Sequence, residues 1–173
     1  MANLTDLKID WLRGGKSSYP IPMAASQSIY PRSGKFVTAA TTGATLTADA
    51  DTLLSGWVEC GPWDYTNKCA STHFLSSGTA RATLLNCIRD LTAVFRMPLH
   101  YAAAVYITNY ADTLIGYLRD IVTSTYQYCD MTNGSVDVLV VVGGKAATAV
   151  NVAGSVGDGY VDVMMSPAHA IGV

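Results

Sequence analysis

The stretch "SVDVLVVVGG", Ser135 to Gly144, decides the class of fold. It is a β-branched run bounded by Asn-Gly and Gly-Gly, which is typical of a strand. The segment "GYVDVMM", Gly159 to Met165, has the same character and follows a Gly-Asp-Gly turn. Upstream, "KFVTAATTGATLTADA", Lys35 to Ala50, is rich in Thr and Val around a Thr-Gly turn. The sequence therefore predicts a mainly β protein.

In two other segments the spacing of apolar residues does not distinguish a helix from strands. The first, "TARATLLNCIRDLTAVFRMPL" (Thr79 to Leu99), fits two strands around Arg89-Asp90, and residues 79–91 fit either a helix or a hairpin. The second, "YADTLIGYLRDIV" (Tyr110 to Val122), has helical spacing with a glycine at its centre, which weakens a helix. Both alternatives stay open for each segment. The residues that would share a helical face are Leu84, Leu85, Ile88 and Leu91 in the first, and Leu114, Leu118 and Ile121 in the second.

Two short stretches of the chain recur later in similar form. "ADTLLSGW", Ala50 to Trp57, returns as "ADTLIGY", Ala111 to Tyr117, and "VFRMPLH" near residue 100 returns as "VMMSPAH" near residue 169. Repeats in one order predict two related β-units, residues 35–100 and 101–173, which share a core because each is marginal alone. A chance match in a chain rich in Thr, Ala and Val is the alternative. If the units are related, Leu53, Leu54 and Trp57 pack in one as Leu114, Ile115 and Tyr117 pack in the other.

Residues 1–34 form a separate N-terminal region in this interpretation. Leu4, Leu7, Trp11 and Leu12 fall on one face of a short helix that Gly14-Gly15 would end. An extended arm follows, because Pro20, Pro22 and Pro31 fix the backbone and exclude a helix. Helix and arm are too apolar to stand alone, so each packs either on its own domain or on a neighbouring chain.

Composition excludes several classes of protein. The 173 residues are 50% apolar and 14% charged, with a net charge of −2 and no basic run. Nucleic-acid binding and an electrostatic membrane anchor both need a basic face, so we expect neither. The longest apolar runs are strand-sized, and the N-terminus lacks the apolar core of a signal peptide. We expect synthesis in a cytoplasm, with reduced cysteines and a surface that is either largely covered by partners or simply poor in charge.

No group of residues in the sequence has the types and spacing of a known catalytic site. The four cysteines, Cys60, Cys69, Cys87 and Cys129, lack the close pairs of a zinc site. Cys69 and His73 would meet only on a helix, and the glycine-lysine stretches lack the full phosphate-binding pattern. The sequence predicts no catalytic residue, no metal and no cofactor, and therefore a protein that is not an enzyme. A small Cys/His-dependent enzyme stays as an alternative.

Two stretches carry a resemblance to a known class of protein: "GKFVTAATTGATLTADADTLLSGWVECG" (Gly34 to Gly61) and "VGDGYVDVMMSPAHAIGV" (Val156 to Val173). With their short apolar-Gly strands and Gly-Asp turns they resemble the virion proteins of tailed bacteriophages, in particular capsid decoration (cement) proteins. The resemblance implies a small β-barrel or β-tulip-like fold. It also implies a homotrimer that is made in the host cytoplasm and binds the major capsid protein on the outer surface of the head.

A protein in that role needs apolar anchors, because aromatic and large aliphatic side chains carry most interface energy. Repetition by symmetry then multiplies modest contacts into avidity. Other phage structural components, such as a tail-tube, head-tail or capsid protein, stay as alternatives. The candidate interface residues are Leu4, Leu7, Trp11, Tyr19, Ile21 and Tyr30.

Overall fold

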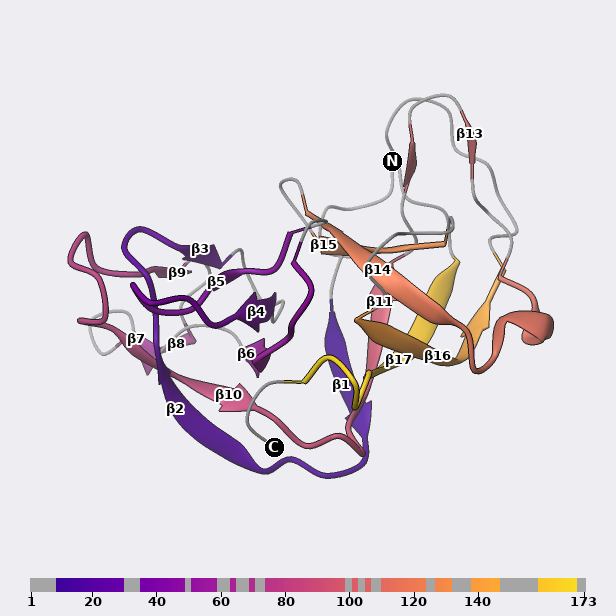
Figure 1. Cartoon of the computed structure of the whole chain (residues 1–173), viewed down its shortest axis with the longest axis horizontal. Coiled ribbons are helices and arrows are strands. Elements are labelled where there is room, and N and C mark those ends of the chain that lie inside the picture. The colour runs from indigo at the N-terminus through magenta and orange to yellow at the C-terminus, as the bar shows by residue number, and fades with distance from the viewer. Residues whose placement is uncertain are drawn as a thin grey trace.

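The chain was analysed as a computed structural model, in which the described protein is mainly β and forms two antiparallel sheets (Figure 1). Within the described part, no helix has the length and apolar character needed to cross a membrane. The structure describes residues 9–29, 35–48, 51–58, 63–64, 69–70, 74–98, 101–102, 105–106, 110–123, 127–131, 138–146 and 159–170.

The larger sheet has six strands in the order β1-β11-β17-β16-β14-β15. Its centre confirms the two strands predicted from the β-branched runs, which pair with each other from Leu139↔Met165 to Lys145↔Tyr160. Along β17, Val161, Val163 and Met165 face the core and the residues between them face outward, as a half-buried strand requires. The strands are β1 (Asp10–Arg13), β11 (Val94–Pro98), β14 (Leu118–Thr123), β15 (Gln127–Asp130), β16 (Leu139–Lys145) and β17 (Tyr160–Met165).

The smaller sheet has five strands in the order β2-β10-β6-β4-β5. These strands are β2 (Ser18–Pro22), β4 (Lys35–Thr38), β5 (Thr45–Leu46), β6 (Gly56–Val58) and β10 (Leu84–Ile88). Three further pairs of short strands lie outside the two sheets. They are β3 (Ser28–Ile29) with β9 (Phe74–Leu75), β7 (Trp63–Asp64) with β8 (Cys69–Ala70), and β12 (Tyr101–Ala102) with β13 (Val105–Tyr106).

One long antiparallel ribbon joins the two sheets. The β1–β2 segment pairs with the β10–β11 segment, so each of these two stretches leaves one sheet and enters the other, as the lower part of Figure 1 shows. At the bend, Gly14 has φ +90°, and a Cβ there would lie 1.9 Å from the Thr92 carbonyl oxygen. A Cβ on Gly15 would lie 1.7 Å from an Asp90 carboxylate oxygen. The Gly-Gly pair therefore makes the corner possible.

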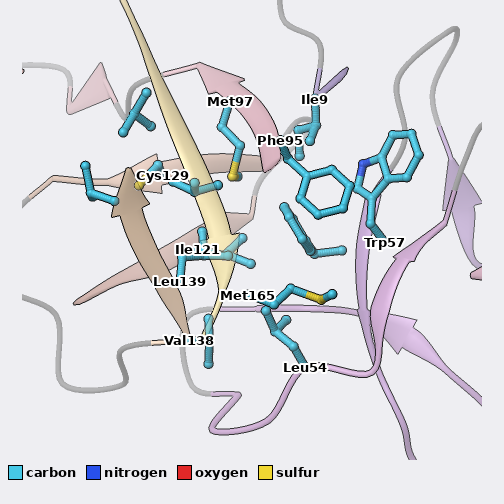
Figure 2. Packing of buried hydrophobic residues seen from close by; sticks show 14 of the residues in the cluster. Ile9, Leu54, Trp57, Phe95, Met97, Ile121, Cys129, Val138, Leu139 and Met165 are labelled. Atoms are coloured by element: carbon cyan, nitrogen blue, oxygen red, sulfur yellow. The ribbon is translucent and has the colours of Figure 1, made fainter. Parts of the chain in front are cut away.

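The main core fills the space between the two sheets (Figure 2). Phe95 of the six-stranded sheet meets Phe36 edge-on at 5.2 Å between ring centroids and Trp57 at 5.3 Å. Both partners come from the five-stranded sheet. Aromatic contacts of this kind fix the two sheets against each other.

A second, smaller core lies on the opposite face of the five-stranded sheet, and it is built by simple alternation along three strands. Phe36, Trp57 and Ile88 enter the main core, while their chain neighbours enter the second. The buried members of the second core are Met23, Val37, Ala44, Val58, Leu85 and Cys87.

Two expectations about the fold need correction. The sheets are stacked and do not close into a barrel: within the described residues β1 and β15 do not pair, and β2 and β5 meet only where β2 ends and β5 begins, at the single parallel Met23↔Ala44 bridge. The expected N-terminal helix is not confirmed, because Asp10–Arg13 forms β1, in which Trp11 lies opposite Phe95. Pairing with β11 supplies contacts that an isolated short helix would lack. Gly14-Gly15 turns the sheet corner instead of ending a helix.

Both ambiguous segments form strands. In the first, β10 and β11 follow each other but belong to different sheets, so residues 79–91 are neither a helix nor half of a hairpin. In the second, a single 3-10 turn, η2 (Asp112–Leu114), precedes β14. Partners on both sides of β10 and β14 satisfy their backbone groups, which overrides the weak helical spacing.

Candidate assembly surfaces

The predicted anchors fall into different environments. Trp11 is half-buried and packs against the main core, and Ile21 is half-buried against the second core. Tyr19 is 58% exposed. The expected arm therefore packs on its own domain wherever it is described, and only Tyr19 of these three stands in solvent. The remaining predicted anchors, Leu4, Leu7 and Tyr30, lie outside the described residues.

Tyr19 belongs to an edge strand that is closed to further strand pairing. The Met23 N–H donates to the Thr83 carbonyl at 2.8 Å, so the backbone nitrogens of Pro20 and Pro22, at alternate positions, face away from β10. Proline has no N–H to offer at these outward positions. At Pro22 the outward carbonyl already accepts the Ala44 N–H at 2.8 Å, so the open part of this edge is the part around Tyr19 and Pro20, where a partner binds mainly through side chains.

Leu84 extends the same edge on the neighbouring strand. It is 62% exposed and lies opposite Pro22, whereas Tyr19 lies opposite the buried Cys87. Successive residues of a strand point to opposite faces, so Tyr19 and Leu84 project from the two faces of the ribbon. We call Tyr19, Pro20, Pro22 and Leu84 the β2 edge.

A second apolar surface surrounds the turn before β14, at the far right of Figure 1. Ile115 is 51% exposed, Tyr117 57% and Leu118 37%, within four consecutive residues. A run of exposed large apolar side chains costs solubility unless something covers it. We call Asp112, Ile115, Tyr117, Leu118 and Arg119 the Ile115 patch.

The backbone holds this patch firmly. The Gly116 N–H donates to the Val141 carbonyl at 2.8 Å, and the Val141 N–H donates to the Tyr117 carbonyl at 3.0 Å. Leu114 packs against the main core just before the exposed residues. The patch is therefore presented by the six-stranded sheet as a fixed surface.

Two charged residues flank the exposed apolar run in the sequence, an exposed aspartate and a buried arginine. Asp112 is exposed, and its carboxylate accepts a hydrogen bond of 3.0 Å from the Tyr110 hydroxyl. Arg119 is 6% exposed; it donates to the Leu118 carbonyl at 2.7 Å and lies 5.5 Å from the centroid of the Tyr117 ring. Its Nε is buried without an acceptor, and within the described residues no carboxylate pairs with the guanidinium.

The described cysteines are poorly suited to chemistry. Burial raises the pKa of the Cys87 thiol to about 12, the nearby Arg89 opposing the shift. Burial also raises the pKa of Cys129. A thiol in such surroundings stays protonated and is a weak nucleophile. Cys60, His73 and the side chain of Cys69 lie outside the described residues, so the alternative of a Cys69–His73 site is not tested.

Two further titratable residues, Lys35 and His169, have surroundings typical of a structural role. Lys35 is 2% exposed opposite Val58, and burial lowers its pKa to about 8. His169 places Nδ1 2.8 Å from the Thr52 carbonyl oxygen, and its own carbonyl accepts from the Leu54 N–H at 2.8 Å. Among the described residues, no cluster of three or more His, Cys, Asp or Glu has a metal-binding arrangement.

Sequence reasoning missed most of these surface residues. It expected Leu53, Leu54 and Trp57 to pack as Leu114, Ile115 and Tyr117 do. This is wrong for three of the six residues, because Leu53, Ile115 and Tyr117 are exposed. The available signal was the unbroken apolar character of residues 114–118. A half-buried strand alternates, so such a run has to expose part of its apolar surface.

Comparison with known proteins gave no match among family models, curated proteins or solved structures. Function is therefore argued from the two surfaces themselves.

Proposed function

We propose that this protein is a virion structural protein of a tailed bacteriophage, a capsid decoration protein that binds the outer surface of the head. In this role it associates with further copies of itself and with the major capsid protein. It stabilises the shell by repeated protein–protein contacts, and its work is binding without catalysis.

The observation that carries the proposal is the β2 edge. Tyr19 and Leu84 present large apolar groups on both faces of a ribbon whose outward backbone donors are replaced by prolines. Such an edge resists uncontrolled strand addition, which protects the free protein from aggregation. It can still wedge apolar side chains into a groove of a partner.

The distance between the two surfaces also supports the proposal. β2 and β10 lie in the left half of Figure 1, whereas the turn before β14 lies at the far right. A decoration protein needs one surface for the shell and another for its own copies. Many modest contacts, repeated by the symmetry of a head, then give high avidity.

The test is binding of the purified chain to phage heads that lack it, measured by co-sedimentation and electron microscopy. We expect Tyr19→Ser with Leu84→Ser to weaken binding by about tenfold or more, because each apolar anchor contributes on the order of 1 kcal/mol. Thr113→Ser, at an exposed position of η2 and outside the β2 edge, is the control. Equal binding by the double variant and the control would contradict the proposal.

Point variants are needed because residues 1–33 cannot be removed cleanly. That deletion would take away β1 and β2, together with Met23, which is fully buried in the second core. Rings or tubes formed by the purified chain alone would favour a tail-tube, head-tail or capsid protein instead.

A further inference from the structure

We draw no further inference here: the strongest candidate, the exposed apolar surface of Ile115, Tyr117 and Leu118 at the turn before β14, carries none because nothing among the described residues shows what covers it.

Discussion

The stretches Ala50–Trp57 and Ala111–Tyr117 align with one deletion and share the residues Ala-Asp-Thr-Leu and a glycine before an aromatic residue, yet they differ in backbone and in burial. Residues 112–114 form the 3-10 turn η2, whereas residues 51–55 have no helical turn and Gly56 begins β6. Each stretch contains a glycine with positive φ, +141° at Gly56 and +88° at Gly116, followed directly by an aromatic residue. Trp57 is 4% exposed and packs on Phe95 in the main core, as Figure 2 shows, whereas Tyr117 is 57% exposed.

Position in the sheets explains this difference. β6, which contains Trp57, is the central strand of the five-stranded sheet and faces the other sheet across the core. Tyr117 precedes β14 at the point where the strand begins, beyond the region that the opposite sheet covers. The comparison shows that a repeated sequence fixes neither the local geometry nor the burial, because both depend on the neighbouring elements.

The largest expected difference is between Trp57→Ala and Tyr117→Ala. Removing the buried indole should lower the free energy of unfolding by about 3–5 kcal/mol, as other buried aromatic truncations do. Exposed Tyr117→Ala should cost about 0.5 kcal/mol or less in the monomer. Urea unfolding monitored by circular dichroism measures both.

Trp57→Phe sharpens this result. The indole Nε1 is buried without a described acceptor, so phenylalanine loses volume but no hydrogen bond. It should be clearly milder than Trp57→Ala. Equal losses for Trp57→Ala and Tyr117→Ala would show that the two sites are equivalent after all.

The two glycines should differ by a smaller amount. A Cβ at Gly56 would lie 2.4 Å from the Ile88 carbonyl oxygen and 2.5 Å from the Cys87 sulfur, in addition to the strain of a positive φ. We expect Gly56→Ala to cost about 3 kcal/mol, combining backbone strain with overpacking. Nothing lies within 4 Å of a Cβ at Gly116, so Gly116→Ala should cost about 1 kcal/mol, from strain alone.

Thermal unfolding of the two glycine variants at one pH gives the comparison. A Gly116→Ala variant as unstable as Gly56→Ala would mean that the turn before β14 is packed more tightly than its exposure indicates.

The pH dependence of stability should be tied to the first of the two regions. Lys35 lies opposite Val58, next to Trp57, and burial lowers its pKa from 10.5 to about 8 in the folded protein. Between these values the unfolded chain binds more protons than the folded chain, so stability rises with pH. Lys35 by itself should contribute about 1 kcal/mol to this rise from pH 8 to pH 9, and the net rise is smaller because unfolded thiols begin to ionise in the same interval.

Above pH 9 the sign reverses. The unfolded thiols of Cys87 and Cys129 ionise from about that pH, while burial raises the pKa of both in the folded state. The unfolded chain then binds fewer protons and stability falls. Lys35→Met should abolish the rise below pH 9 and keep the fall above it. A rise that persists in Lys35→Met would assign it to another group.

The smallest expected effect concerns the contacts that hold each turn. His169→Ala removes the hydrogen bond between Nδ1 and the Thr52 carbonyl and should cost about 1 kcal/mol. Tyr110→Phe removes the bond to the exposed Asp112 and should cost about 0.5 kcal/mol. Denaturant midpoints measure both, and a larger loss for Tyr110→Phe would reverse the ranking of the two turns.

The sequence by itself determined the mainly β class, the strands β16 and β17, and the extended backbone of the arm. These follow from β-branched runs, turn residues and prolines, which act locally on the backbone. Of the candidate surfaces, it identified Tyr19 but left out Leu84, Ile115, Tyr117 and Leu118. Exposure depends on which sheet covers which strand, and no local pattern records that.

Only the tertiary structure decided the corner at Gly14-Gly15 and the arrangement of the two open sheets. It also decided that Trp57 is buried whereas Tyr117 is exposed. Each of these depends on contacts between residues far apart in the chain, such as Trp11 with Phe95 across the ribbon and Phe95 with Trp57 across the core. The hydrophobic effect drives apolar side chains from water without specifying a partner. The partner is chosen by the packing of the whole chain, and where that packing ends, the apolar surface of residues 115–118 remains exposed.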